Sequence, residues 1–225
     1  RDPFKELCTA VQGNGMKTGF YYSHGTDWRN KIGLTGTPEE IDMKYFEATV
    51  KPHLEELSTN YGEQIVAWFD LGWKDRAELA QTCIDILRKN NPNIIISSRI
   101  GSGLGDFTAE RDAYIPPIPS EGNWETCMTF NDHWDWTPSD KTQKSYQEII
   151  RMLASVRARG GNLLLNVGPD VRGCIPLMER TTLKQVGLWL EKNGESIYGV
   201  QKTPYPDLPW GVCTHKPGTL YLQIM

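Results

Sequence analysis

Residues 64–99, QIVAWFDLGWKDRAELAQTCIDILRKNNPNIIISSR, decide the fold class of this chain of 225 residues. Their pattern predicts an apolar strand over 65–70, an amphipathic helix over 74–90 and a second apolar strand over 94–98. The Asn-Pro-Asn segment at 91–93 ends the helix, because these residue types favour turns. A strand, a helix and a strand in this order, with both strands almost wholly apolar, are typical of a parallel sheet that helices cover.

The same alternation continues on both sides of this segment. Further strands are expected over residues 17–23, 125–130, 162–167 and 219–224, and further helices over 4–12, 38–60, 145–159 and 176–193. Pro52 should kink or split the helix over 38–60, because proline has no backbone N–H to donate. The Gly- and Pro-rich residues 101–123 are expected to form a long loop.

Two α/β architectures fit this alternation, a doubly wound sheet and a (β/α)8 barrel. No GxGxxG follows a strand, which disfavours a dinucleotide-binding doubly wound sheet. Polar residues gather where the strands end, as Asp70, Arg99 and Glu125 illustrate, and strand ends form the active face of a barrel. Because only five strand–helix units can be counted, we expect an α/β fold with a partial (β/α)8-like (TIM-type) barrel.

Composition excludes several classes of function. The 24 basic and 28 acidic residues leave a net charge of −4, which argues against nucleic acid as the main partner. No apolar run approaches the ~20 residues that span a bilayer, so no membrane partner is expected. The five cysteines show no CxxC or Cys/His spacing, so neither a metal centre nor a disulfide framework is predicted. The many aromatic residues fit either a large core or a carbohydrate site.

Two carboxylates stand out on the predicted strands. Asp70 closes an apolar strand, and Glu125 follows Trp124 on another. Each has a purely structural alternative: a capping or salt-bridging role for Asp70, and a solvated strand end for Glu125. Two carboxylates on converging strands are also what glycoside hydrolysis needs, one as nucleophile and one as acid. The chain has no GxSxG and no HExxH, which argues against serine and zinc hydrolases.

Several motifs resemble one enzyme family. They are WFDLGW at 68–73, NWETCMT at 123–129, GGNLLLNVGPDVRG at 160–173 and WLEKNGESIYG at 189–199, with FYYS at 20–23 and Asp27–Trp28 as further matches. In this order they resemble the α-L-fucosidases of glycoside hydrolase family 29. The resemblance implies a barrel over residues 1–199 with its N-terminal part missing, and the truncated start of a C-terminal β-sandwich over 200–225. It also implies a secreted, periplasmic or lysosomal protein, although this chain shows no signal peptide.

The resemblance further implies a retaining exo-α-L-fucosidase. Such an enzyme removes terminal α-L-fucose from glycans or glycoconjugates through a covalent fucosyl-aspartate. Asp70 matches the nucleophile, and Trp68, on the same face of the strand, matches a residue that lines the sugar pocket. Glu125 matches the acid/base of many members, and Trp124 beside it would favour the protonated acid; Glu121 is the rival.

Two more residues correspond to sugar contacts in relatives. Arg99 is one, and Tyr22 is chosen over Tyr21 as the other. Relatives often carry Asn-Asp where this chain has Ser97–Ser98, and their adjacent His pair has no match here. No cofactor or metal is implied, the partner is a fucosylated substrate, and a homo-oligomer stays open.

The alternative is a non-catalytic sugar-binding relative, or an inactive fragment of such an enzyme. The presence of both Asp70 and Glu125 favours the enzyme, because a decayed site has no reason to keep both. A partial barrel leaves strand edges unpaired. We therefore expect the 225 residues alone to be poorly soluble or inactive, and a protein extended at the N-terminus to be active.

Overall fold

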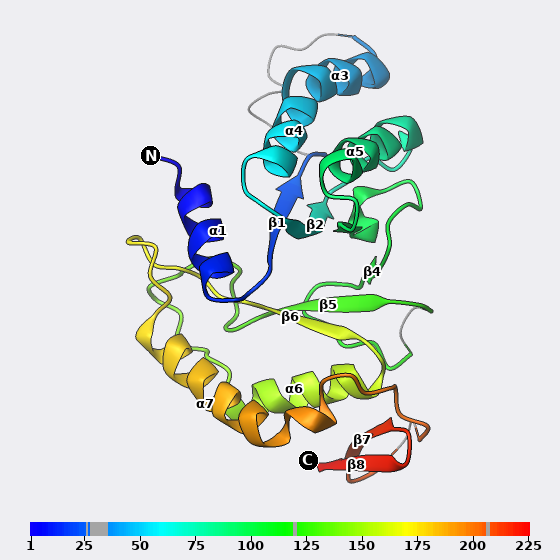
Figure 1. Ribbon diagram of the computed structural model, residues 1–225. Coiled ribbons are helices and arrows are strands. Elements are labelled where there is room, and N and C mark those ends of the chain that lie inside the picture. The colour runs from blue at the N-terminus through cyan, green and yellow to red at the C-terminus, as the bar shows by residue number, and fades with distance from the viewer. Residues whose placement is uncertain (26, 28–35, 119–120, 206–207) are drawn as a thin grey trace. The chain divides into compact units, whose positions relative to one another are not determined.

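The computed structural model describes residues 1–25, 27, 36–118, 121–205 and 208–225. The chain divides into two compact units, Arg1–Thr108 and Ala109–Met225 (Figure 1), and each is described by itself. Two segments named above, Trp28 and the Pro119–Ser120 part of the loop before Glu121, lie outside the described residues.

A parallel sheet forms the centre of the first unit. Its strands are β1 (Thr18–Ser23), β2 (Gln64–Asp70) and β3 (Ile95–Ile96), in the order β1-β2-β3. The α/β class and the strands expected from residues 17–23, 65–70 and 94–98 are therefore confirmed, with small shifts of their bounds. Ser23 pairs with Asp70, so β1 and β2 end side by side.

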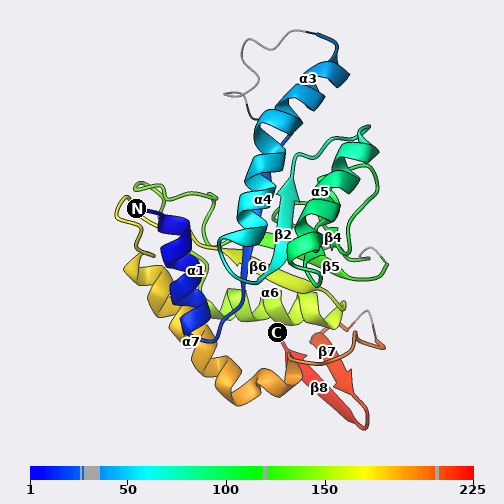
Figure 2. The ribbon, with the colours of Figure 1, turned by 45° about the horizontal axis from the view of Figure 1, so that its top comes forward.

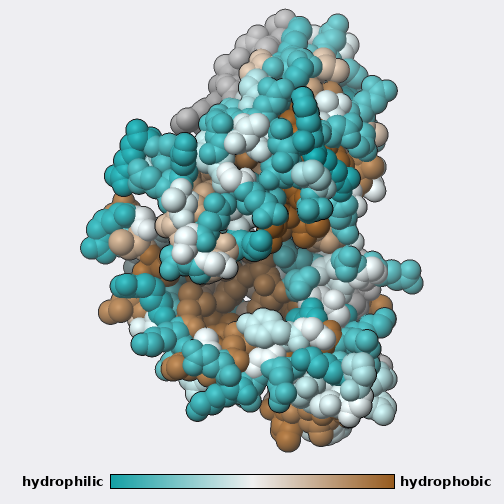
Figure 3. Space-filling model, viewed as in Figure 1, coloured by the Kyte–Doolittle hydropathy of each residue, from teal (hydrophilic) through white to brown (hydrophobic). Residues whose placement is uncertain are grey.

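Helices flank this sheet. They are α1 (Pro3–Gly13), α3 (Pro38–Tyr45), α4 (Lys51–Thr59) and α5 (Ala77–Asn90), with a π-helical turn η1 (Phe46–Val50) and a 3-10 turn η2 (Ser98–Ile100). The expected interruption near Pro52 is the η1 turn just before α4, where the proline cannot donate to the helical ladder. Figures 1 and 2 show α4 and α5 side by side, and the α3 end of this unit is largely hydrophilic in Figure 3.

The core of the first unit lies between these helices and the sheet. Its largest fully buried side chains include Phe69 from β2, Phe46 from η1 and Leu87 from α5. Leu79, Cys83 and Leu87 recur along one face of α5, as the helical spacing predicted. This packing holds β2 rigidly and leaves the carboxyl end of the strand for polar residues.

A second sheet, in the order β4-β5-β6, belongs to the second unit. β4 (Thr108–Ala109) lies where the units divide, and β5 (Trp124–Thr129) and β6 (Asn162–Asn166) run parallel. Helices α6 (Tyr146–Ala158) and α7 (Leu177–Asn193) lie side by side against β6 in Figures 1 and 2.

One core cluster of this unit is built around the buried side chains of Phe130, Ile149 and Val186. The Ser145 side chain and Glu148 form a capping box that starts α6, since each accepts a backbone N–H of the other. The positions of α6 and α7 confirm the helices expected over 145–159 and 176–193.

The Trp124 ring explains why a glycine stands at position 161, in the Gly-Gly turn before β6. Trp124 is 1% exposed, and its indole N–H donates to the Arg159 carbonyl oxygen at 3.2 Å. A Cβ atom on Gly161 would lie 2.4 Å from the Trp124 ring, so no larger residue fits there. The ring therefore packs beneath the turn that ends α6.

An antiparallel hairpin closes the second unit. After η3 (Gly194–Ser196), β7 (Gly211–Lys216) pairs with β8 (Thr219–Ile224). The strand expected over 219–224 is confirmed, whereas β7 was not predicted. Leu222 and Ile224 of β8 are exposed, and brown surface lies at the end of this strand in Figure 3. Among the described residues, every helix is too short or too polar to span a bilayer.

Candidate active site

Asp70 is the last residue of β2, and three donors converge on its carboxylate. Oδ2 accepts a hydrogen bond from the Tyr21 hydroxyl at 2.7 Å. Oδ1 accepts one from the Leu71 main-chain N–H at 3.0 Å and one from Arg99 Nη1 at 3.3 Å. The side chains of Asp70 and Arg99 are each 20% exposed. The carboxylate is thus oriented through both oxygens and still reachable from solvent.

Trp68 supplies an aromatic surface beside this carboxylate. Its ring stacks on Tyr21, with 5.7 Å between the centroids and 19° between the planes. The guanidinium carbon of Arg99 lies 4.8 Å from the Trp68 centroid, in cation–π geometry. We refer to Tyr21, Trp68, Asp70 and Arg99 as the Asp70 cluster. Trp68 itself is only 8% exposed, whereas Tyr21 is 60% exposed, so the aromatic surface of this cluster that is open to solvent is mainly that of Tyr21.

Backbone geometry explains how the cluster assembles. Tyr21 and Trp68 are directly paired across β1 and β2, and Trp68 and Asp70 share one face of β2 because side chains alternate. Arg99 comes from η2, directly after β3. Its carbonyl oxygen accepts the Gly72 N–H at 3.1 Å, which joins the loops that follow β2 and β3. Neighbouring parallel strands therefore bring all four residues to one end of the sheet.

The surroundings of Tyr21 raise the pKa of its hydroxyl, which is protonated at neutral pH even at the ordinary value of 10.0. Burial, followed by the hydrogen bond to Asp70, raises the pKa of Tyr21 to about 12. The hydroxyl is therefore a donor to the Asp70 carboxylate at neutral pH.

Tyr22, which the sequence analysis preferred, points to the other face of β1. Its hydroxyl lies 2.9 Å from His53 Nδ1, and its ring packs edge-on against Phe69. Burial raises its pKa well above the ordinary value. The structure thus brings Trp68, Asp70 and Arg99 together with Tyr21, not with Tyr22. The signal that would have identified Tyr21 is the register of β1 against β2, which no residue type reveals.

Glu125 belongs to the second unit and lies at the amino end of β5, where it is the second residue. The expectation that Glu125 lies at a strand end of the barrel's active face is wrong. The active face is formed by the carboxyl ends of the strands, and Glu125 lies near the amino end of β5. It pairs with Asn162, the first residue of β6. Trp124 points to the opposite side, toward the Gly161 turn. It therefore does not shield the Glu125 carboxylate, contrary to the prediction.

Two other carboxylates lie near Glu125 in sequence or along the backbone. Glu121 is exposed, in a bend before β5. Glu110, which the sequence analysis did not single out, donates its main-chain N–H to the Glu125 carbonyl oxygen at 2.8 Å. Glu110 could not be singled out from the sequence, because it follows β4, a strand of only two residues within a Gly- and Pro-rich stretch.

The loop after β6 is held by Asp170. Its carboxylate accepts hydrogen bonds from the Arg172 side chain at 2.6 Å and from the Cys174 N–H at 3.1 Å. These contacts, the Arg172 side chain foremost, lower the pKa of Asp170 to about 2. The GPDVRG part of the resembling motif is therefore an ordered turn.

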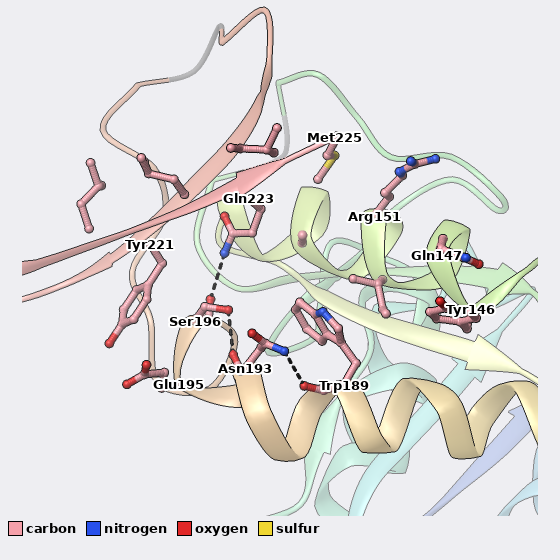
Figure 4. A pocket seen from close by; sticks show the side chains of 15 residues that line it. Tyr146, Gln147, Arg151, Trp189, Asn193, Glu195, Ser196, Tyr221, Gln223 and Met225 are labelled. Atoms are coloured by element: carbon pink, nitrogen blue, oxygen red, sulfur yellow. Dashed lines mark hydrogen bonds between the residues drawn. The ribbon is translucent and has the colours of Figure 1, made fainter.

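A cavity of about 680 Å³ opens elsewhere in the second unit (Figure 4). Side chains from α6, α7, η3 and β8 line it, among them Tyr146, Arg151, Trp189 and Tyr221. It contains none of the residues that the sequence analysis selected. The described residues also hold no group of three or more His, Cys, Asp or Glu arranged to bind a metal ion.

Comparison with known proteins decides the family. The sequence profile described as α-L-fucosidase matches residues 1–195. The chain belongs to this family. Plasma α-L-fucosidase of Rattus norvegicus, a curated relative, is 30% identical over 213 residues, which are 88% of this chain and 46% of that protein. The chain spans about half the length of the curated relatives it matches.

Solved structures of α-L-fucosidases also align with this chain. Isoenzyme 1 of Paenibacillus thiaminolyticus aligns with a TM-score of 0.90 and 30% identity, over 100% of this chain and 60% of that one. A variant of the α-L-fucosidase AlfC, solved in complex with Fucα(1,6)GlcNAc, aligns with a TM-score of 0.73 and 31% identity. That alignment covers 87% of this chain and 66% of AlfC.

Proposed function

We propose that the protein containing this chain is a retaining exo-α-L-fucosidase that hydrolyses terminal α-L-fucose from glycans or glycoconjugates. The observation that carries the proposal is the Asp70 cluster. An oriented and accessible carboxylate at the carboxyl end of β2 lies beside an aromatic ring and a cation. Family membership supplies the fucose specificity that this geometry alone does not determine.

The proposed reaction has two steps. Asp70 attacks the anomeric carbon, and the bond to the leaving oxygen breaks as an acid donates a proton to that oxygen. We assign this acid to Glu125 on the motif resemblance alone, since its place near the amino end of β5 gives the assignment no support. Water then attacks the anomeric carbon of the fucosyl-aspartate, Glu125 takes the proton from water, and the Asp70 carboxylate is released. Both steps invert the anomeric centre, so the overall reaction retains its configuration.

The remaining residues bind and orient. We assign Trp68 to contact with one face of the sugar ring and Arg99 to contact with its hydroxyl oxygens. Tyr22 is kept as a predicted sugar contact, and Tyr21 is added because its hydroxyl lies against Asp70. No cofactor is required, since the nucleophile and the proton both come from side chains.

The proposal extends to the substrate and the fold. A fucosylated oligosaccharide is the proposed partner, in line with the fucosylated disaccharide bound to AlfC. The parallel strands of the two units support a partial (β/α)8-like barrel over residues 1–199. The β7–β8 hairpin supports the start of a β-sandwich over 200–225.

Removal of the nucleophile tests the function. In the protein expressed from its complete reading frame, Asp70→Gly should lower turnover of an activated aryl α-L-fucoside by at least about 10³-fold. Added azide should restore turnover and give a fucosyl azide of inverted configuration. Near-normal hydrolysis by Asp70→Gly would overturn the assignment. Binding of fucose by an inactive parent protein would instead support the sugar-binding alternative.

A further inference from the structure

Trp134 is an exposed tryptophan in the loop that follows β5. It is 43% exposed, so burial of apolar surface does not explain why so large a ring stands at this position. The loop begins at the carboxyl end of β5, and the carboxyl ends of the strands form the active face of the barrel proposed above. An aromatic ring that is open to solvent at such a face is available to contact a bound sugar.

Asn166, the last residue of β6, is bonded to the main chain of this loop. Its side-chain Nδ2 donates a hydrogen bond to the Trp134 carbonyl oxygen at 2.7 Å. The Asn166 carbonyl oxygen accepts the Phe130 N–H at 3.1 Å, at the start of the loop. One residue of β6 therefore holds both the beginning of the loop and the main chain of its exposed tryptophan.

A close contact of Gly168 holds the next part of the loop. A Cβ atom on Gly168 would lie 2.8 Å from the Trp136 nitrogen and 2.9 Å from the Asp135 carbonyl carbon, so the two main chains touch. The bond from Asn166 fixes the peptide group that follows Trp134, and the contact with Gly168 fixes the peptide group after that. Two successive peptide groups are thus held against the chain that continues from β6.

We propose that Asn166 is a positioning residue: its side-chain amide fixes the main chain of Trp134, and thereby the place on the active face from which the ring contacts the sugar. This inference rests on the proposed function. Once the main chain is held, the ring can turn only about its own side-chain bonds, which have few staggered positions. Loss of the amide should therefore weaken sugar binding and leave the chemical step unchanged.

The first experiment compares Asn166→Ala with Asn193→Ala in the protein expressed from its complete reading frame. Asn193 is the matched control, because its Nδ2 donates the same kind of bond, to the Trp189 carbonyl oxygen at 2.9 Å in α7. Asn166→Ala should raise the KM for an aryl α-L-fucoside about fivefold and change kcat less than about twofold, as expected for lost uniform binding. Asn193→Ala should keep both constants within about twofold of the parent. If Asn166→Ala does not fold, Asn166→Asp keeps the shape and removes the donor.

The second experiment tests whether Asn166 acts through the tryptophan ring. In a Trp134→Ala background, Asn166→Ala should change KM by less than about twofold, because no ring is left to position. Gly168→Ala displaces the same loop by another route, since its Cβ would meet the Trp136 nitrogen, and should show the same dependence on the ring. An equal rise in KM with and without the ring would mean a general structural role and would overturn the inference.

An unchanged KM for Asn166→Ala, or a loss confined to kcat, would also overturn it, with the role of Asp70 intact. Failure of the proposed function looks different, because Asp70→Gly would then keep its activity or azide would fail to restore it. The affinity for L-fucose, measured by calorimetry, then replaces KM in the comparison of Asn166→Ala with Asn193→Ala. A parent protein that does not bind L-fucose would overturn both proposals.

Discussion

Strands β2 and β5 carry similar motifs and use them differently. Both are parallel strands with a buried tryptophan close to a carboxylate, Trp68 and Asp70 in one and Trp124 and Glu125 in the other. In β2 the two residues share a face, and the carboxylate is at the carboxyl end. In β5 they are consecutive, so they point to opposite faces, and the carboxylate is near the amino end.

The difference shows that strand direction decides whether a motif of tryptophan and carboxylate indicates a site. The Trp68 ring packs against Tyr21 and Arg99, which also bind Asp70, so the ring and the carboxylate form one site. Trp124 packs against the Gly161 turn and has a structural role. A carboxylate beside a tryptophan in the sequence is therefore weak support for a site until the spacing and the end of the strand are known.

The largest expected effect tests the β2 side of the comparison. Asp70→Asn keeps the shape of the side chain and removes its nucleophilic charge, so kcat should fall by at least about 10³-fold for every α-L-fucoside. Asp75→Asn is the matched control, since Asp75 is an exposed acid five residues along the same loop. Comparable rates for the two variants would place the chemistry elsewhere.

The β5 side is tested by dependence on the leaving group. Glu125→Ala should slow natural fucosides about 10²-fold or more, and good aryl leaving groups much less, because only the former need a proton. Glu121→Ala and Glu110→Ala are made in parallel and assayed on the same pair of substrates. If either of these shows the selective loss and Glu125→Ala does not, the acid/base role passes to that residue.

A smaller effect distinguishes the two adjacent tyrosines. Tyr21→Phe removes the hydrogen bond to Asp70 Oδ2, and kcat should fall about tenfold, as expected for a bond to a charged group. Tyr22→Phe removes a contact with His53 instead. The ratio of the two kcat/KM values is the measurement. A larger loss for Tyr22→Phe would favour the residue chosen from the family resemblance over the one chosen from geometry.

The smallest effect concerns a carboxylate outside the proposed site. Glu179 of α7 is 2% exposed, and burial raises its pKa above 4.5 despite a hydrogen bond from the Gly168 N–H. The folded state then holds this proton more tightly than the unfolded state, so stability falls as pH rises from about 4.5 through the folded pKa. Glu179→Gln lacks this loss.

Thermal unfolding checks that sign. The gain in stability of Glu179→Gln over the parent should be about 1 kcal/mol near pH 7 and smaller at pH 4. Glu191→Gln is the control, because Glu191 is exposed on the same helix. A gain that does not change with pH would mean that Glu179 does not titrate in this range.

The sequence predicted most of the regular structure, because periodicity survives in long amphipathic elements. The α5 helix follows from the spacing of Leu79, Cys83 and Leu87, and the strands on either side follow from their apolar runs. Strand β7 was missed because GVCTHK has no clear alternation, and β4 because a two-residue strand has no period at all. Such strands are set by the strand that each one pairs with and not by their own residue pattern.

The site was predictable only in part. Trp68, Asp70 and Arg99 follow from strand ends and motif resemblance, and the structure brings them together. The choice of Tyr21 depends on which face of β1 lies beside Asp70, and two adjacent tyrosines give no difference in residue type that would indicate it. Leu71 has a φ of +52°, which a leucine rarely adopts, so no residue propensity could have indicated this conformation.

The fit between Trp124 and Gly161 has a consequence for how this family can diverge. Because a single Cβ at position 161 would overlap the indole ring, the two positions share one fixed volume. Substitutions there should occur as correlated exchanges: a relative with a side chain at the position of Gly161 should carry a smaller residue at that of Trp124. We therefore expect the Trp124 ring and the absence of a side chain at position 161 to be inherited together.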